Sequence, residues 1–495
     1  MKVVVIASEA VPFAKTGGLA DVAGALPRAL AALGHEATLI LPAYRRASLA
    51  EIPLEPTGHT LRIPVGSRTI EGRILAANLP GSTAKAFLID QPSFFDRDDL
   101  YGRNGVDFPD NSERYIFFAR AALEAISLLG LAPDVIHCND WQTGLIPVFL
   151  QEIYRTRPGL EKAGTLLTIH NLAYQGEFWH WDMPLTGLDW RLFNFHQLEF
   201  HGRLNFLKAG IVFADALSTV SPTYAREIQT PALGCGLDGL LRSRASDLTG
   251  IVNGIDKTIW NPSIDPLLAD RYDRQTHEAG KAACKALLQR RLNLPERPEV
   301  PLFAQIGRLD PQKGWDLVAE IADDLLAGDV QMVVLGEGQP RFHELLDRLS
   351  NRHAGKLRAV LEFLPSLAHQ IEAGADIFLM PSLYEPCGLN QLYSLAYGTV
   401  PIVHATGGLV DTVVDATETS LANRTATGFA FREPTAASFF EAIRRAQSLW
   451  SDRDKWAQLV QNGMARDWSW DASARDYVRL YEDVKVRTAK QMQAG

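Results

Sequence analysis

The chain alternates short apolar runs with stretches of helical periodicity, and this alternation restricts its fold more than any other feature. Apolar positions at helical spacing run from Leu19 to Leu33 after the first predicted strand. We expect Gly34 to end that helix and Pro27 to kink it or split it in two. Strands alternating with helices predict a parallel sheet covered by helices on both faces. The predicted strands of this half are 3–7, 37–41, 86–89, 135–138, 165–169 and 216–220.

The same pattern starts again in the second half of the chain. An apolar run at 302–306 is followed by a turn and by a helix that begins at Trp315, and further strands are predicted at 330–335, 359–363, 377–380 and 400–403. Between the halves, residues 240–255 interrupt the periodicity. We therefore predict an α/β chain with two doubly wound domains. Their predicted bounds are 1–245 and 246–465, with a C-terminal helix over 466–495.

Composition narrows the class of protein. A chain of 495 residues with 46% hydrophobic and 22% charged residues can bury two or three cores, and a formal charge of −9 disfavours non-specific nucleic-acid binding. The four cysteines form no C-x-x-C pair, which favours reduced thiols in the cytoplasm. Because no apolar run approaches about 20 residues, we expect no membrane partner.

A glycine-containing turn, Lys15-Thr16-Gly17-Gly18, lies between the first strand and the first helix. Glycines let a ligand approach the backbone, and the N–H groups at a helix start favour an anion. Lys15 adds a positive charge to this turn. The pattern is neither a dinucleotide fingerprint nor a Walker loop, and a tight turn with a solvated lysine fits the same residues. Both interpretations remain open at this point.

Two loops of the second half follow predicted strands in the same way. Arg308 and Lys313 lie on a turn that can point both cations at one diphosphate, although two surface charges would look alike. Glu385 lies between two prolines after the strand at 377–380, where open α/β sheets bind ligands. It is a candidate acceptor for sugar hydroxyls, or simply an acid that stabilises a helix start.

Polar side chains also follow two strands of the first half. His170 ends one strand, while His137 and Asp140 end another, so that three polar groups are expected at one sheet edge. An aromatic-rich segment over 178–200 comes next. It fits packing under a long loop better than stacking on sugar rings.

The chain lacks several common catalytic motifs and contains one short internal repeat. The chain has no Walker, G-x-S-x-G or H-E-x-x-H motif, and neither D-x-D (residues 96–98 and 452–454) closes a clear apolar strand, which disfavours a metal-held nucleotide. The sequence at 16–21, TGGLAD, recurs at 406–411 as TGGLVD. Two related half-folds would show this repeat, and so would chance.

Five motifs in order give a resemblance over almost the whole chain: KTGGLADV, HNLAYQG, GRLDPQKG, PSLYEPCGLNQLYSLAYG and TGGLVDTV. They resemble the bacterial glycogen synthases, the ADP-glucose-dependent α-1,4-glucan synthase family that includes plant starch synthases. The resemblance implies the glycosyltransferase B fold, with two Rossmann-like domains facing across a cleft. It assigns the acceptor side and a catalytic histidine to 1–245, donor binding to 246–465, and a helix returning to the first domain to 466–495.

The resemblance also implies the reaction. It predicts transfer of glucose from ADP-glucose to the non-reducing end of glycogen or another α-1,4-glucan, with retention of configuration and with neither a metal nor a further cofactor. A UDP-glucose-dependent transferase or an epimerase on the same fold is the alternative. A non-catalytic glucan-binding protein fits less well.

By position, the resemblance assigns catalytic roles to His170, Arg308, Lys313 and Glu385. Two positions depart from many relatives: Asn390 replaces a threonine and Phe363 replaces a tyrosine, whereas Tyr393 at the second acid position of the E-x7-E layout is usual for the family. The implied substrate-binding residues are Lys15, Gly17, Gly18, Asp21, Asp140, Asn171, Phe363, Cys387, Gly388, Leu389 and Asn390.

Overall fold

The computed structural model describes residues 1–48, 52–103, 105–362 and 364–494, and its chain divides into two compact units. Unit 1 comprises Met1–Gly254 with Trp470–Gly495, and unit 2 comprises Ile255–Ser469. The predicted boundaries at 245 and 465 fall a few residues earlier. Unit 1 extends further because its edge strand β14 (Leu248–Gly250) pairs with β13 (Ala216–Thr219), and unit 2 extends to Ser469 because that residue pairs with Ile255.

Unit 1 is built on one large sheet whose described strands run in the order β14-β13-β9-β8-β1-β2-β5-β4-β3. Every pair is parallel except β5–β4 and β4–β3. The central strands are buried along almost their whole length, as expected for a sheet covered on both faces. Their bounds are β1 Lys2–Ile6, β2 Glu36–Pro42, β3 Glu55–Val65, β4 Arg68–Asn78, β5 Lys85–Asp90, β8 Val135–Asn139 and β9 Gly164–Ile169.

The hairpin of β3 and β4 is a feature that the strand prediction missed. Burial alternates along the second half of β3, where Leu61, Ile63 and Val65 are buried and their neighbours are exposed. This half-buried edge carries many charged residues, so it has no continuous apolar run to detect. Small sheets of unit 1 join β10 (Glu177–Trp179), β12 (Arg203–Asn205) and β11 (Glu199–Phe200), and β6 (Gly102–Arg103) with β7 (Val106–Asp107).

Helices cover the sheet of unit 1, and the first of them corrects one prediction. Helix α1 (Gly18–Ala32) continues through Pro27, so the chain is not split there. Proline removes one backbone donor, whereas the helix buries Val22, Leu26 and Leu30 in the core, and this burial holds the helix together. The other helices of this unit are α2 Pro92–Phe95, α3 Asn111–Leu128, α4 Ile146–Phe149, α5 Met183–Thr186, α6 Phe206–Phe213, α7 Pro222–Glu227 and α8 Asp238–Ser243.

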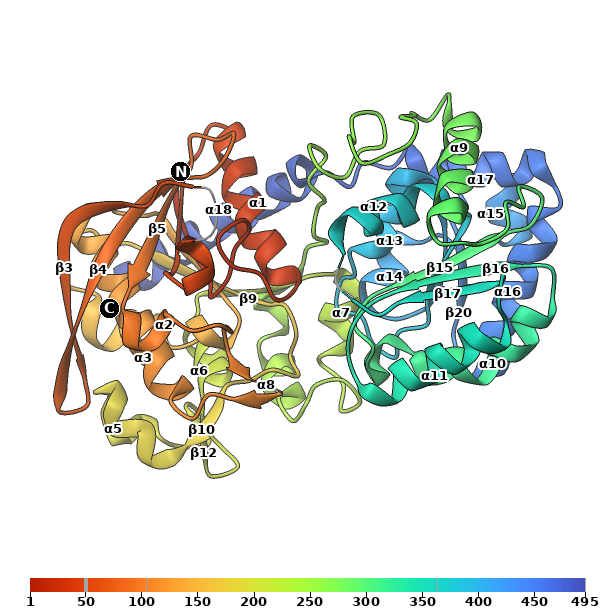
Figure 1. The fold of residues 1–495 in the computed structure, drawn as a ribbon. Helices are drawn as coiled ribbons and strands as arrows, with labels where there is room; N and C mark the ends of the chain where they lie inside the picture. Colours follow the sequence, from red (N-terminus) through yellow and green to blue (C-terminus); the bar gives the residue numbers. More distant parts are fainter. Residues whose placement is uncertain (49–51, 104, 363, 495) are drawn as a thin grey trace. The chain divides into compact units, whose positions relative to one another are not determined.

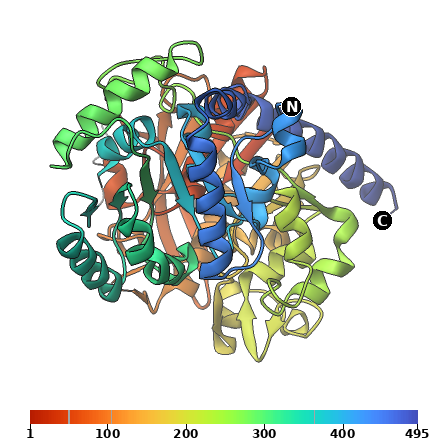
Figure 2. The same ribbon diagram turned by 90° about the vertical axis from the view of Figure 1, so that its right-hand side faces the viewer.

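The long helix α18 (Trp470–Ala494) ends the chain and packs within unit 1 against α1, β8 and β9. It leads to the C-terminus in Figure 2. Its Tyr481 hydroxyl lies 2.9 Å from Nδ1 of His137, whose Nε2 lies 2.6 Å from Oγ1 of Thr168. Burial lowers the pKa of His137 to about 3. His137 therefore lies in the core beneath α18 and does not join the polar groups at the sheet edge, contrary to the prediction.

Unit 2 contains a parallel sheet with the strand order β17-β16-β15-β18-β19-β20. Helices α9 and α12 lie on one face, and α10, α11 and α16 lie on the other (Figure 1). The strands are β15 Leu302–Ile306, β16 Gln331–Leu335, β17 Leu357–Val360, β18 Ile377–Met380, β19 Val400–His404 and β20 Phe429–Phe431. The helices are α9 His277–Arg291, α10 Trp315–Ala327, α11 Pro340–Arg352, α12 Pro365–Gly374, α13 Asn390–Tyr397, α14 Gly407–Thr412, α15 Glu418–Ala422, α16 Ala436–Trp450 and α17 Arg453–Met464.

The contact between His137 and Tyr481 yields a stability prediction. Replacing Tyr481 by Phe removes the buried hydroxyl and leaves one ring nitrogen of His137 without this partner. We expect the free energy of unfolding of unit 1 to fall by about 1–3 kcal/mol in urea denaturation. Tyr174→Phe is the control, because Tyr174 is 54% exposed and should change stability little. Equal stability of both variants would mean that the His137 contact contributes nothing.

Candidate functional site

Each large sheet reverses its strand order at one point, and the candidate residues gather there. In unit 1 the chain proceeds outward from β1 through β2 in one direction and through β8 and β9 in the other. In unit 2 the same reversal lies between β15 and β18. Loops at the carboxyl ends of strands that flank such a reversal diverge and leave a crevice for ligands. The two sets of candidate residues occupy these loops.

The first loop of unit 1 carries Lys15, Gly17, Gly18 and Asp21 between β1 and α1. Gly17 is the N-cap of α1 with no side-chain cap, Gly18 is the first helical residue, and Asp21 lies in the first turn. The ammonium of Lys15 lies 2.7 Å from Oδ1 of Asp21, and both side chains are partly exposed. Burial raises the pKa of Asp21, and Lys15 opposes this shift. The predicted cation is therefore present but already paired with an acid.

Glu9 completes this loop and was missed by the sequence reasoning. Its buried carboxylate accepts hydrogen bonds from the backbone N–H of Thr16 and, at 2.8 Å, from the Thr16 hydroxyl. The carboxyl group of Glu9 thus lies at the N-terminus of α1 in the structure itself. The available signal was position: Glu9 follows β1 by three residues, at the same sheet edge as the predicted residues.

His170 follows β9, and its hydrogen bonds assign its tautomer. Its Nε2 lies 2.9 Å from Oδ1 of Asn139, and the amide nitrogen of Asn139 donates to the carbonyls of Ile6 and His137. That orientation makes Asn139 the acceptor and Nε2 of His170 the donor. Burial lowers the pKa of His170 to about 3, so the ring is neutral and Nδ1 can accept a hydrogen bond from a ligand hydroxyl.

Asp140 and Asn171 frame the same histidine. Oδ1 of Asp140 accepts the backbone N–H of His170 at 2.7 Å, and burial raises the pKa of Asp140 to about 7. The backbone of Asp140 has φ 58° and ψ −174°, a region that costs about 1–3 kcal/mol for a residue with a side chain. The side-chain oxygen of Asn171 accepts the N–H of Ala173 and shapes the loop, and its amide nitrogen can donate to a ligand.

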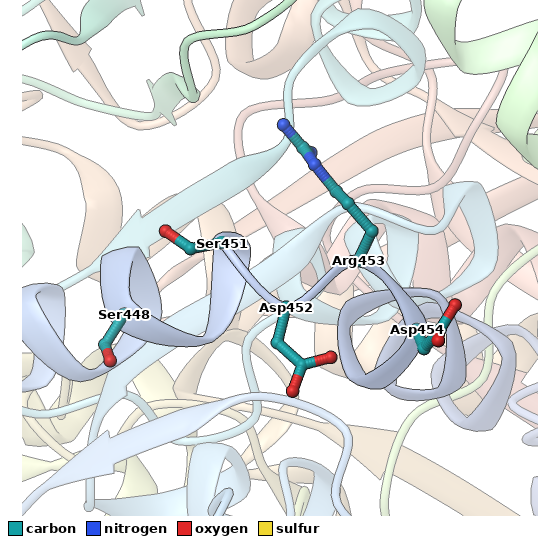
Figure 3. A pocket seen from close by; sticks show the side chains of 5 residues that line it. All are labelled: Ser448, Ser451, Asp452, Arg453 and Asp454. Carbon is teal, nitrogen blue, oxygen red and sulfur yellow. The ribbon is translucent and has the colours of Figure 1, made fainter.

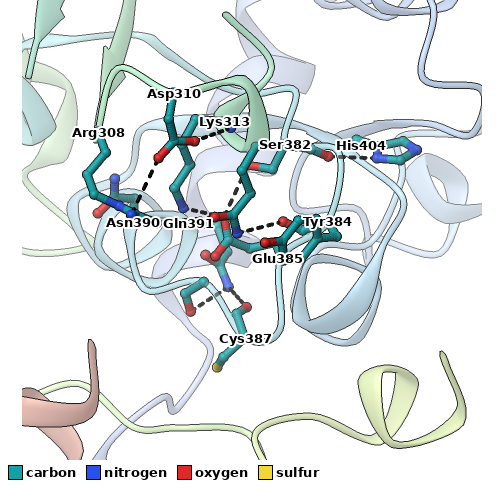
Figure 4. A network of polar contacts seen from close by, with 12 residues as sticks. Arg308, Asp310, Lys313, Ser382, Tyr384, Glu385, Cys387, Asn390, Gln391 and His404 are labelled. Atoms are coloured by element: carbon teal, nitrogen blue, oxygen red, sulfur yellow. Dashed lines mark hydrogen bonds and ion pairs between the residues drawn. The ribbon is translucent and has the colours of Figure 1, made fainter. Parts of the chain in front are cut away.

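Unit 2 brings Lys313 and Glu385 into direct contact (Figure 4). Nζ of Lys313 lies 2.6 Å from Oε2 of Glu385, and the hydroxyl of Ser382 donates to the same oxygen at 3.1 Å. Lys313 comes from the turn after β15 and Glu385 from the loop after β18. The two strands that flank the reversal point therefore each supply one member of a mostly buried ion pair.

Arg308 lies on the same turn as Lys313 but is more exposed. Its guanidinium donates to Oε1 of Gln312 at 3.1 Å and lies 3.5 Å from Asp310, with 56% of the side chain exposed. Asn390 begins α13, and its amide donates to the carbonyl of Ile306 at the end of β15 at 2.7 Å. Asn390 thus has a structural contact that joins the two loops.

Cys387, Gly388 and Leu389 continue the loop from Glu385 into α13. The amide nitrogen of Gln391 donates to the carbonyls of Cys387 and Gly388, each at 3.0 Å, so the loop is tied to the helix that it precedes. Leu389 is the N-cap residue of α13. Phe363, the predicted adenine contact, lies outside the described residues.

Some rings of the predicted aromatic segment pack against other aromatic side chains, and others are exposed. Phe178 packs against Trp141 and Phe206 with ring centroids 5.6 and 4.7 Å apart, as expected for packing beneath a loop. Trp179 and Trp181 are 62% and 58% exposed, and Phe195 is 75% exposed. Nothing in these contacts joins the exposed rings to His170 or Asp140.

Both D-x-D sequences form ion pairs within the protein. The side chains of Asp96 and Asp98 bind Arg45, and Asp452 caps α17 and pairs with Lys455 at 2.7 Å. The second D-x-D lines a shallow hollow at the turn between α16 and α17 (Figure 3). Within residues 1–48, 52–103, 105–362 and 364–494, no cluster of three or more His, Cys, Asp or Glu side chains is arranged to hold a metal ion.

Among the helices in the described part of the chain, none combines the length and the apolar character that crossing a membrane requires.

Comparisons with known proteins assign the family. The family described as "Starch synthase catalytic domain" matches residues 2–243, and the family "Glycosyl transferases group 1" matches residues 289–463. The chain is 48% identical to a glycogen synthase of Anaeromyxobacter sp. (strain Fw109-5), over 98% of this chain and 99% of that protein. It is 47% identical to glycogen synthase 1 of Methylococcus capsulatus, over 98% of this chain and 96% of the relative.

Solved structures agree with this assignment. The catalytic domain of starch synthase IV from Arabidopsis thaliana, bound to ADP and acarbose, matches with a TM-score of 0.91 and 33% identity, over 98% of this chain and 99% of that one. A sucrose-phosphate synthase from Thermosynechococcus elongatus, 16% identical with a TM-score of 0.60, shares the fold. The chain therefore belongs to the glycogen synthase and starch synthase family, enzymes of the glycosyltransferase B fold that transfer glucosyl units in glycogen and starch synthesis.

Proposed function

We propose that this enzyme transfers glucose from ADP-glucose to the 4-hydroxyl at the non-reducing end of an α-1,4-glucan, with retention of the α configuration. The observation that carries the proposal is the contact between Lys313 and Glu385 at the reversal point of unit 2, with Arg308 on the same turn. The similar starch synthase IV domain binds ADP and acarbose, which supports a nucleoside diphosphate and an α-glucan as ligands here.

Arg308 and Lys313 act on the leaving diphosphate. Negative charge grows on the diphosphate as its bond to the sugar breaks, so a cation near it is a stronger partner in the transition state than in the ground state. The exposed guanidinium of Arg308 can reach a ligand, and Lys313 can share its ammonium between Glu385 and a phosphate. Lys15 supplies a third cation, because its ammonium can bind a phosphate oxygen in place of part of its contact with Asp21.

Neutral hydrogen-bonding groups position the sugar. Nδ1 of His170 accepts a hydrogen bond from a hydroxyl of the transferred glucose, because the other ring nitrogen donates its hydrogen bond to Asn139. Glu385 accepts hydrogen bonds from sugar hydroxyls through Oε1, because Oε2 already accepts hydrogen bonds from Lys313 and Ser382. The acceptor attacks on the face from which the diphosphate leaves, and a phosphate oxygen takes the proton of the attacking hydroxyl. A covalent glucosyl adduct trapped on Asp140 or Glu385 would contradict this mechanism.

The second Thr-Gly-Gly sequence holds the Glu385 loop in place. The backbone N–H of Gly408 lies 3.1 Å from the carbonyls of both Glu385 and Pro386. A Cβ atom at Gly407, where φ is 47°, would lie 2.0 Å from the carbonyl oxygen of Glu385, and one at Gly408 would lie 2.2 Å from that of Cys387. Glycine is required here because the two backbones approach too closely for a side chain.

The proposed enzyme uses ADP-glucose as a substrate and no further cofactor, since three cations of the chain provide the positive charge. We also propose that it acts in the cytoplasm. The proposal rests on the sequence, in which the four widely spaced cysteines form no C-x-x-C pair.

The choice of donor is tested directly. Labelled ADP-glucose and labelled UDP-glucose are each offered with glycogen, and the label in the polymer is measured. We expect incorporation from ADP-glucose. Incorporation from UDP-glucose alone would assign a uridine-dependent transferase, and binding of glycogen with no incorporation from either donor would assign a glucan-binding protein.

Removing a cation tests the role of the diphosphate contacts. Arg308→Ala, Lys313→Ala and Lys15→Ala should each lower kcat/KM for ADP-glucose by about 30- to 1,000-fold while circular dichroism stays unchanged, because a charge-assisted contact to the leaving group is lost. Arg348→Ala is the control, since the side chain of Arg348 on α11 is 65% exposed and lies 3.9 Å from Glu344 on the same helix. Unchanged kinetics in all three variants would exclude these cations from the reaction.

The packing of Gly408 gives a further prediction. Gly408→Ala forces the loop of Glu385 to move, and displacement of a positioned group by about 1 Å costs about 100-fold in rate. We expect kcat to fall by that order with a folded protein. Gly239→Ala in α8 is the matched control, because its added Cβ would meet nothing closer than 3.8 Å. Equal activity of the two variants would show that the loop tolerates displacement.

A further inference from the structure

Glu9 is a buried carboxyl group that the mechanism above does not use. It is 3% exposed and lies three residues beyond the end of β1, beside the reversal point of unit 1. Its Oε2 accepts both the backbone N–H and the hydroxyl of Thr16, and its Oε1 lies 3.9 Å from where a Cβ of Gly17 would stand. Glu9 therefore shapes the loop that precedes α1.

The charges that face Glu9 are mostly negative. Asp21 in the first turn of α1 and Asp140 after β8 both interact unfavourably with its carboxylate, and that carboxylate in turn raises the pKa of Tyr101 and Tyr115. Lys15 is the cation on this loop, and its ammonium contacts Asp21 at 2.7 Å. Burial raises the pKa of Glu9 to about 7, while the hydrogen bonds from Thr16 and Gly17 oppose that rise.

We propose that Glu9 is a positioning residue of the donor site, and that it takes up a proton when a nucleoside diphosphate binds at the Lys15–Gly18 loop. This inference rests on the proposed function, which brings a diphosphate to that loop. The diphosphate adds negative charge beside three acids, and protonation of Glu9 removes one negative charge without altering the shape of the loop. Oε2 can still accept from Thr16 when the proton resides on Oε1.

The pH dependence follows from linkage. A bound diphosphate disfavours the charged form of Glu9, so the complex retains the proton to a higher pH than the free enzyme does. Below pH 7 Glu9 is already protonated in the free enzyme, and binding needs no further proton there. Above pH 7 each binding event must take up a proton, and affinity falls. We expect the Kd for ADP to rise about tenfold between pH 7 and 8.5.

Glu9→Gln separates this role from a purely structural one. Glutamine copies the protonated acid, since its oxygen can accept from Thr16 and it carries no charge. The variant should bind ADP with a Kd that changes little with pH, and at pH 8.5 it should bind about 30-fold more tightly than the wild type does. If Glu9 acted only as an anionic cap of the loop, the variant would instead bind ADP more weakly at every pH.

The proton itself is measured by isothermal titration calorimetry of ADP at pH 8 in buffers of different ionisation enthalpy. Wild-type enzyme should take up close to one proton more than Glu9→Gln. Protons that ADP itself gains or loses are the same for both enzymes, so they cancel when the two values are subtracted. Glu36→Gln is the control, because Glu36 is an exposed acid of the same unit, paired with Lys2 at 3.6 Å. It should behave like the wild type.

The outcomes separate the two hypotheses. Wild-type enzyme that binds no ADP at any pH would overturn the proposed donor and this inference together. Binding of ADP with equal proton uptake in wild type and Glu9→Gln would overturn the inference alone and would assign any uptake to Asp140. Weaker binding by Glu9→Gln at all pH values, with no difference in proton uptake, would also overturn it.

Discussion

The reversal of strand order in each sheet is the constraint on which the rest of the structure depends. After β1 the chain continues to β2 on one side of the sheet, and after β8 it continues to β9 on the other side. The loops that follow β1 and β8 therefore diverge and leave space between them for a ligand at the edge of the sheet. The same holds for β15 and β18, whose loops supply Lys313 and Glu385. Both strands of each pair are buried in the sheet, so the position of a functional group is set by core packing two or three residues away.

Charge balance then distinguishes the two units. In unit 2 the mostly buried Glu385 has the ammonium of Lys313 at 2.6 Å, so its charge is compensated within the protein. In unit 1 the donors to the buried Glu9 among the described residues are neutral, from Thr16 and the backbone of Gly17, while the ammonium of Lys15 contacts Asp21. A buried acid with neutral donors and acidic neighbours, such as Glu9, has a pKa near 7. The two units therefore respond differently to an arriving anion.

Much of this arrangement could be predicted from the sequence, and the failures have physical causes. The strand 377–380 was predicted correctly, because fully buried strands are continuous apolar runs. The start of α10 at Trp315 was also predicted correctly. The hairpin of β3 and β4 was missed because its edge carries charges on the exposed face. His137 was placed at the sheet edge, yet side-chain direction alternates along a strand, and the partner that holds His137, Tyr481, lies 344 positions away. Glu9 was missed because no spacing rule marks a lone acid.

The repeated Thr-Gly-Gly sequence shows how far a motif alone determines function. Both copies begin a helix, α1 in unit 1 and α14 in unit 2. In the first copy Gly18 is exposed and Thr16 turns its N–H toward the carboxylate of Glu9, so the helix start faces an anion. In the second copy Gly407 and Gly408 are buried, and the N–H of Gly408 points to the carbonyls of Glu385 and Pro386. The residues permit close approach in both places, and the neighbouring loop decides whether a ligand or the chain itself uses it.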